Sequence, residues 1–215
     1  MQRNPITSDM YRSKNMPIIR YPTIDELRII VNHISNTDKE LSLLIRFLAS
    51  TGLRITEALS LWFDNDAAPL ISHSDKRSLI TDRYIIVDGK RVSNNVPKIR
   101  ELPIEIFNFS ENIINLGEII AELREMNTGK VFSYSNQKFL LDRLYRDYRT
   151  IRGRLRHRYS FHCYRKFATN YWEKELGWAG NICAWVAGHT PAVKYTNYTD
   201  IIQAVELTRL LTSKK

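Results

Sequence analysis

Two capped helical segments near the start of the chain constrain its fold more than any other sequence feature. Residues 23–26 (Thr-Ile-Asp-Glu) form a capping box, in which the Thr23 hydroxyl can accept the amide of Glu26 while the Glu26 carboxylate reaches back. Apolar residues then recur at helical spacing, at Leu27, Ile30, Val31 and Ile34. A helix with one apolar stripe must bury it against other elements, so this pattern predicts a packed helical body.

A second amphipathic helix is expected between Asp38 and Gly52. Asp38 can cap its start, and Gly52 marks its end, because glycine readily adopts the left-handed conformation that closes many helices. Its apolar stripe consists of Leu41, Leu44, Ile45 and Leu48. Other periodic patterns predict a short helix around 55–62 and further helices at 104–125, 137–149, 160–175, 180–187 and 200–212.

The middle of the chain favours a small sheet. Residues 84–87 are a short β-branched run followed by Asp88-Gly89, and residues 100–104 resemble a second strand closed by Pro103. Residues 65–80, rich in Asp, Ser and His, read as an insertion before this sheet. The predicted fold class is therefore mainly α with a small antiparallel β-sheet (α+β).

Composition excludes several classes of protein. The 215 residues are 43% hydrophobic and 26% charged, which is typical of a globular domain with a real core. No run of 18 apolar residues is present, and the polar start of the chain does not resemble a secretory signal. Two cysteines, Cys163 and Cys183, cannot build a disulfide framework. We expect a soluble cytoplasmic protein that does not enter a membrane.

The charge balance points to a polyanionic partner. Thirty-two Lys and Arg against 23 Asp and Glu give a net charge of +9, which favours nucleic acid, although general solubility is the alternative. Six arginines and a single acid, Asp147, lie between Arg146 and Arg158, with Tyr145, Tyr148 and Tyr159 interleaved. The candidate DNA-binding residues are Arg149, Arg152, Arg154, Arg156, Arg158 and Lys166.

Three local patterns could carry chemistry, and each is weak alone. Arg54 follows the helix-ending Gly52 and has Glu57 three residues on, within reach along a helix face. His162 and Arg165 lie three apart in HCYRKFAT (162–169). Gly188-His189 is followed by Tyr198, nine residues after the histidine.

In this order the three patterns resemble the catalytic domain of the tyrosine recombinase (phage integrase) family, which carries Arg, Lys, His-x-x-Arg, His or Trp, and Tyr along the chain. The resemblance covers about residues 23–200. It implies a tyrosine recombinase catalytic-domain-like fold at 23–199, after an extended arm at 1–22. A C-terminal helix or tail at 200–215 would then dock on a neighbouring subunit.

The resemblance implies a site-specific DNA recombinase or integrase that cleaves and rejoins strands through a 3′-phosphotyrosine, without metal, ATP or cofactor. Arg54 and Arg165 would grip the non-bridging phosphate oxygens, which planar guanidiniums can do in a bidentate way. His162 would accept a proton, His189 would bind the phosphate, and Glu57 would orient Arg54. Tyr198 would be the nucleophile, because its distance from His189 along the chain fits the family better than that of Tyr195.

A lysine of the family protonates the leaving 5′-oxygen, and two candidates exist here. Lys90 follows the first predicted strand, which fits the family's position. Lys98 lies just before the second strand and is the alternative, because the connection from Lys90 is longer than a tight hairpin needs.

The implied partner is double-stranded DNA, bound by a protein that is a monomer in solution and a homotetramer on paired sites, as for a virus, plasmid or other mobile element. Family members usually carry a separate helical DNA-binding domain ahead of the catalytic one, whereas only residues 1–22 precede the first capping box here. A compact recombinase, a fragment and a protein with another role all fit this departure. The rival functions are a type IB topoisomerase-like or telomere-resolving enzyme and a non-catalytic DNA-binding regulator.

Overall fold

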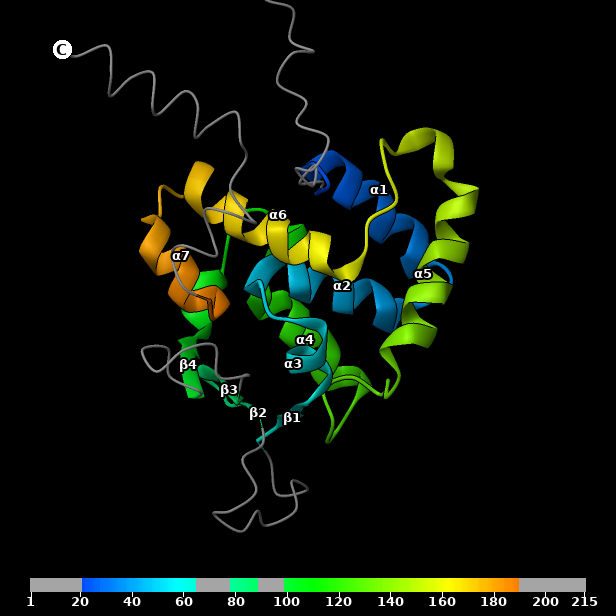
Figure 1. Cartoon of the computed structure of the whole chain (residues 1–215). Coiled ribbons are helices and arrows are strands. Elements are labelled where there is room, and N and C mark those ends of the chain that lie inside the picture. The colour runs from blue at the N-terminus through cyan, green and yellow to red at the C-terminus, as the bar shows by residue number, and fades with distance from the viewer. Residues whose placement is uncertain (1–20, 65–77, 89–98, 190–215) are drawn as a thin grey trace, which may run out of the picture.

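The computed structural model describes residues 21–64, 78–88 and 99–189, and Figure 1 shows helices gathered around a central pair with a small sheet at one end. Within these residues the α-helices are α1 (Ile24–Ser35), α2 (Lys39–Thr51), α3 (Ile55–Leu59), α4 (Leu116–Met126), α5 (Gln137–Thr150), α6 (Phe161–Lys174) and α7 (Gly180–Ala187). Short 3-10 turns occur at η2 (Ile104–Phe107), η3 (Asn112–Ile114) and η4 (Arg152–Arg154). None of the helices in the described ranges is long and apolar enough to cross a membrane.

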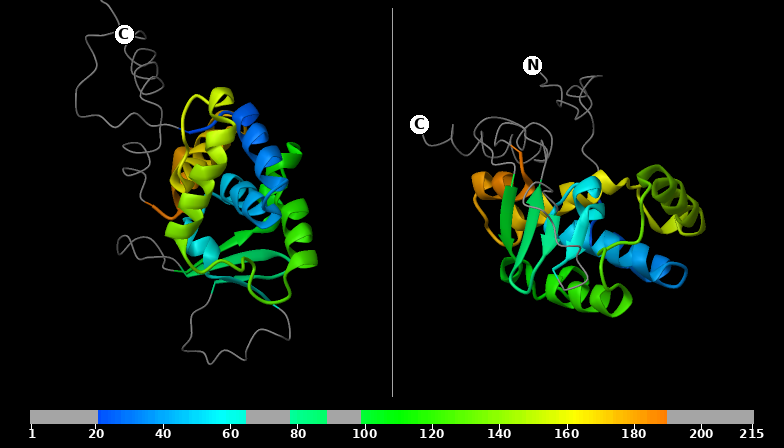
Figure 2. Two further views of the ribbon diagram at one scale, coloured as in Figure 1. Left: turned by 90° about the vertical axis from the view of Figure 1, so that its right-hand side faces the viewer. Right: turned by 90° about the horizontal axis from the view of Figure 1, so that it is seen from below.

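The described strands are β1 (Leu61–Phe63), β2 (Ser78–Ile80), β3 (Tyr84–Asp88) and β4 (Ile99–Pro103), and they form one sheet in that order. The β1 and β2 strands pair in parallel, and the other neighbours pair antiparallel. Figure 2 shows this sheet lying along one end of the helical body. The mainly α fold class with a small sheet is confirmed, and the sheet is mixed because of the β1 and β2 pair.

The expected caps set the first two helices. The hydroxyl of Thr23 accepts the amide of Glu26 at 3.2 Å, and a Glu26 carboxylate oxygen accepts the amide of Thr23 at 3.0 Å. Asp38 caps α2 by accepting the amide of Leu41 at 3.0 Å. These contacts confirm the sequence signals at both helix starts, and α2 then packs against α1, α4 and α6 in the core.

The end of α2 is held against α6 by a glycine and a tryptophan. Gly52 adopts a φ of 62°, and a Cβ built on it would lie 2.6 Å from the Trp172 ring. The Trp172 indole N–H donates to the carbonyl of Ser50 at 3.2 Å. Because α3 begins directly after this contact, the packing of Trp172 fixes where Arg54 stands.

Two sequence predictions need correction near the sheet. The expected helix at 55–62 ends at Leu59, and residues 61–63 form strand β1 instead. Part of the expected insertion, residues 78–80, forms strand β2, while 65–77 lie outside the described residues. Strands of three residues carry no periodic signal, and their pairing depends on partners distant in the chain, so local patterns could not show them.

The expected helix at 104–125 is also wrong in its first half. The chain leaves β4 at Pro103, turns through the two short 3-10 segments, and starts α4 only at Leu116. Asn115 caps α4 by accepting the amide of Glu118 at 3.2 Å. The helices expected at 137–149, 160–175 and 180–187 are confirmed by α5, α6 and α7, and the one at 200–212 lies outside the described residues, as do residues 1–20 of the predicted arm.

The contact between Gly52 and Trp172 generates the first prediction. Gly52→Ala combines an unfavourable left-handed backbone with a Cβ that overlaps the indole, and we expect a loss of ~3 kcal/mol in the free energy of unfolding. Gly177→Ala is the matched control, because Gly177 has a φ of 67° but no atom within 4 Å of its Cβ position. That control should lose only ~1 kcal/mol. Equal losses in denaturant titrations of the two variants would contradict the packing role of Trp172.

Candidate active site

The first element of the site is the start of α3. Arg54 occupies the N-cap position, and its amide donates to the Glu57 carboxylate at 2.8 Å. Its guanidinium also donates to Glu57, with Nη1 to Oε1 at 2.8 Å. The Glu57 side chain is only 5% exposed, whereas that of Arg54 remains 31% exposed. Glu57 therefore holds Arg54 by both its backbone and its side chain.

The second arginine comes from α6. Arg165 is 1% exposed, and its Nη1 donates to the carbonyl of Gly52 at 2.6 Å. Its Nη1 also lies 3.9 Å from the Oε2 of Glu57. Arg54 and Arg165, distant in sequence, are thus brought to the same carboxylate.

A third arginine in this cluster, Arg100, was missed by the sequence analysis. It comes from β4, is 2% exposed, and donates from Nη2 to the Oε1 of Glu57 at 3.0 Å. A usable signal exists: strand alternation puts residue 100 on the same face as Leu102, and that face is buried. A buried arginine requires a carboxylate partner, and Glu57 provides it.

The three guanidiniums also meet the end of α7. The last carbonyls of a helix have no partner within it and carry partial negative charge, so cations are favourable there. Each arginine donates to a different carbonyl: Arg100 to Val186 at 2.6 Å, Arg165 to Ala187, and Arg54 to Gly188 at 3.2 Å. The end of α7 and Glu57 thus provide the negative groups that hold the cluster together.

Two opposing effects set the pKa of Glu57. Burial raises the pKa of this carboxyl, but Arg100, the amide of Arg54, and the charges of Arg165 and Arg54 together outweigh burial and hold it below its usual value. Glu57 is therefore ionised at neutral pH. Within the part of the chain that the structure describes, one carboxylate among three guanidiniums leaves a local excess of positive charge.

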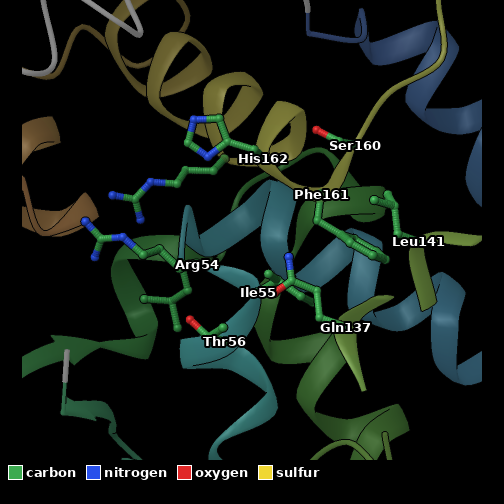
Figure 3. A pocket seen from close by; sticks show the side chains of 10 residues that line it. Arg54, Ile55, Thr56, Gln137, Leu141, Ser160, Phe161 and His162 are labelled. Carbon is green, nitrogen blue, oxygen red and sulfur yellow. The ribbon is translucent and has the colours of Figure 1, made fainter. Parts of the chain in front are cut away.

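An open pocket of about 280 Å³ lies in front of this cluster, and Arg54, Arg165 and His162 all line it. Figure 3 shows Arg54 and His162 on one side of the pocket, with Gln137 and Leu141 of α5 on the other. His162 stands in the first turn of α6. The structure thus brings the first two motifs, the one with Arg54 and the one with His162 and Arg165, together at one cavity.

The environment of His162 keeps its imidazole neutral. Partial burial and the positive charges of Lys166, Arg165 and Arg54 lower the pKa of His162 to about 4. The positive end of the α6 dipole acts in the same direction. In a neutral imidazole one of the two ring nitrogens carries no proton and has the chemistry of an acceptor.

Only part of the third motif, Gly188 and His189, lies within the described residues. His189 follows Gly188, which takes a φ of 70° and ends α7. The residue is 2% exposed and does not line the pocket. Lys90, Lys98, Tyr195 and Tyr198 lie outside the described residues, although Asp88 pairs with Ile99, so both lysines fall in the connection between β3 and β4.

The predicted DNA-binding arginines differ in their surroundings. Arg149, Arg152, Arg154 and Arg158 are exposed, and Lys166 is half-buried. Arg156 is exposed as well, but it also contacts Glu26, donating from its amide at 2.8 Å and from Nη2 at 2.8 Å. The interleaved Tyr148 and Tyr159 are buried in the core, so they do not belong to an exposed patch.

In residues 21–64, 78–88 and 99–189, no group of three His, Cys, Asp or Glu side chains is placed to hold a metal ion. The positive groups around the pocket are guanidiniums, which suit an anion such as a phosphate. The arrangement can therefore bind an anionic group beside a neutral imidazole.

No protein-family model matches the chain, and no curated protein matches its sequence. Solved structures do match its fold. A lambda integrase dimer bound to a COC′ core site superposes with a TM-score of 0.59 and 16% identity over 84% of this chain. For the lambda integrase catalytic core, the TM-score is 0.56 and the identity 18% over 79% of this chain. For XerA recombinase, the TM-score is 0.53 and the identity 18% over 91% of this chain.

The extent of these matches differs among the solved structures. This chain spans 48% of the lambda integrase in the dimer and 64% of XerA, but 91% of the lambda integrase catalytic core. The described residues therefore have the fold of a tyrosine recombinase catalytic domain, which confirms the resemblance at the level of fold.

The surroundings of His162 generate the second prediction. In an NMR titration of the free protein, we expect a pKa of about 4 for its imidazole. Lys166→Gln removes a nearby positive charge and should raise this pKa. Lys174→Gln, at the opposite end of the same helix, is the control and should leave it unchanged. An unchanged pKa in Lys166→Gln, or an equal rise in both variants, would contradict this account of the site.

Proposed function

We propose that this protein is a site-specific DNA recombinase that cleaves and rejoins strands through Tyr198. The observation that carries this proposal is the joint placement of Arg54, Arg165 and His162 around one pocket in a recombinase-type fold. Its partner would be double-stranded DNA, by analogy with the matched lambda integrase dimer bound to a COC′ core site. The protein would act inside the cell, as part of a mobile element.

The two arginines would bind the scissile phosphate. Negative charge on the non-bridging oxygens increases in the pentacoordinate transition state, and fixed guanidiniums stabilise it without reorganising. Glu57 and nearby backbone carbonyls hold both guanidiniums, and both arginines line the pocket where the phosphate would lie. A hydrogen bond from His189 to the same phosphate, the role that the resemblance implies, would require its buried side chain to reach the pocket.

Strand cleavage would then be a balanced displacement at phosphorus. The Tyr198 oxygen bonds to phosphorus as the bond to the 5′-oxygen breaks, which yields a 3′-phosphotyrosine and a free 5′-hydroxyl. The neutral imidazole of His162 accepts the phenol proton, and Lys90 or Lys98 supplies a proton to the leaving oxygen. Rejoining runs the same steps backward, so neither ATP nor a metal ion is needed.

The assembly is proposed from the same resemblance. One of the matched structures is a lambda integrase tetramer bound to a Holliday junction. By analogy, this chain would be a monomer in solution and a tetramer on paired sites, with residues 200–215 of one protomer docking on the next. Such docking would place Tyr198 for attack only when a partner is present.

The third prediction tests the nucleophile. A library of nicked duplexes with random sequence should yield an SDS-resistant protein–DNA adduct, and mass spectrometry should find the nucleotide on Tyr198. Tyr198→Phe should form no adduct, whereas the control Tyr195→Phe should form it normally. Arg54→Lys and Arg165→Lys should slow it about 100-fold, because lysine keeps the charge but not the bidentate geometry.

Sequencing the trapped DNA reports the target site in the same experiment. An adduct in Tyr198→Phe would show that another residue is the nucleophile. DNA binding without any adduct in the wild type would favour a non-catalytic regulator. Relaxation of supercoiled DNA by a monomer, without paired sites, would favour a type IB topoisomerase-like enzyme.

The fourth prediction separates the arginines at 149–158. Arg154 is exposed and contacts no carboxylate of the described residues, whereas Arg156 donates to Glu26. Arg154→Gln should weaken DNA binding and reduce the slope of log affinity against log salt by about 1. Arg156→Gln should instead lower the melting temperature and change the slope less. The reverse order of the two slopes would place Arg156, not Arg154, on the DNA.

A further inference from the structure

Arg100 is a charged residue at the heart of the site that cannot itself meet the DNA. Its side chain is 2% exposed and does not line the pocket that Arg54 and Arg165 share. Arg100 therefore cannot contact a bound phosphate, and it can act there only through its charge or through the groups that it touches.

The fold alone does not require a charge at this position. Arg100 pairs with Val87 across the sheet and shares its buried face with Leu102, so an apolar side chain would suit the same place. Burying a guanidinium is costly, and replacing a buried ion pair by apolar residues is often neutral or stabilising. What an apolar residue cannot supply is the planar fork that binds two acceptors at once.

The fork of Arg100 connects two parts of the site. Its Nη1 donates to the carbonyl of Val186 at 2.6 Å, and its Nη2 donates to the Oε1 of Glu57 at 3.0 Å. The same Oε1 accepts Nη1 of Arg54 at 2.8 Å. This oxygen thus accepts hydrogen bonds from two guanidiniums, the buried one of Arg100 and that of Arg54, which lines the pocket.

Arg100 also supports the turn that leads into His189. Gly188 has a φ of 70°, and a Cβ built on it would lie 2.4 Å from the guanidinium carbon of Arg100. The turn therefore rests directly on the plane of the guanidinium. The amides of Gly188 and His189 donate to Trp185 and Ala184 at 2.9 and 3.0 Å, which makes their exchange with solvent a measure of whether the turn is closed.

We propose that Arg100 is a positioning residue, which fixes Glu57 and the end of α7 in one arrangement so that Arg54 and Arg165 meet a phosphate together. The catalytic part of this inference rests on the function proposed above. Without the fork, Glu57 loses a partner that limits its rotation and Val186 loses its donor. Arg54, which depends on Glu57 and Gly188, then loses its fixed direction.

The test compares Arg100→Met and Arg100→Lys with Arg46→Met. Arg46 is the matched control, because it also joins a carboxylate, Glu122 at 2.7 Å, to a backbone carbonyl, Ile113 at 3.0 Å, but on the α4 side of α2. Affinity for a random duplex, the single-turnover rate of adduct formation and amide exchange are measured for each. Arg100→Lys covers the case in which Arg100→Met does not fold.

Both Arg100 variants should bind DNA within about threefold of the wild type but form the adduct about 100-fold more slowly, because small displacements of reacting groups have effects of this size. Lysine should not rescue the rate, since it retains the charge without the fork. Exchange at Gly188 and His189 should rise about tenfold in both variants and stay unchanged in Arg46→Met.

The two readouts separate this inference from the proposed function. If the wild type forms no adduct, the recombinase proposal fails, and the exchange measurement still decides whether Arg100 fixes the end of α7. Normal rate and normal exchange in the Arg100 variants would overturn the positioning role. A uniform rise in exchange across the domain, matched in Arg46→Met, would also overturn it, because Arg100 would then only stabilise the fold.

Discussion

The Glu57 carboxylate is the interaction on which the rest of this site depends. It is almost fully buried, and it contacts guanidiniums from α3, β4 and α6. These elements are far apart in the chain, and without a shared anion their positive charges would repel one another at close range. Breaking a buried ion pair by removing one partner is strongly destabilising, because the other charge remains buried and uncompensated. The carboxylate therefore determines both where the strands and helices meet and which charges face the pocket.

The balance of charge around Glu57 favours a bound anion over a closed structural cluster. The α7 carbonyls contribute only the partial charges of a helix end, so Glu57 supplies the full negative charge in the described part of the cluster. Arg54 has the most exposed side chain of the three arginines, and it lines the pocket. A phosphate placed there would complete the neutralisation without moving the arginines. Such preorganisation is what makes electrostatic stabilisation of a transition state effective.

The sequence reveals those parts of the fold that local interactions determine. The Thr23 capping box, the Asp38 cap and the left-handed Gly52 each involve residues within four positions, and all are present. The strands β1 and β2 depend on one another across residues 64–77, so no local pattern indicates them. The break in the expected 104–125 helix has a local cause that was overlooked, because Asn115 offers a better N-cap than any residue near Pro103.

The candidate site follows the same division between local and distant signals. Arg54, His162 and Arg165 could be identified because they belong to short motifs in a recognisable order, whereas Arg100 belongs to no such motif. Its signal is a conflict between two local patterns: β4 places residue 100 on a face with Leu102 that must be buried, yet the residue is charged. A conflict of this kind has a physical resolution only if an anion lies nearby in space. Glu57 was the acidic residue among those already singled out for the site. Taken together, the conflict at Arg100 and the role of Glu57 predict a contact between β4 and α3, which neither segment reveals alone.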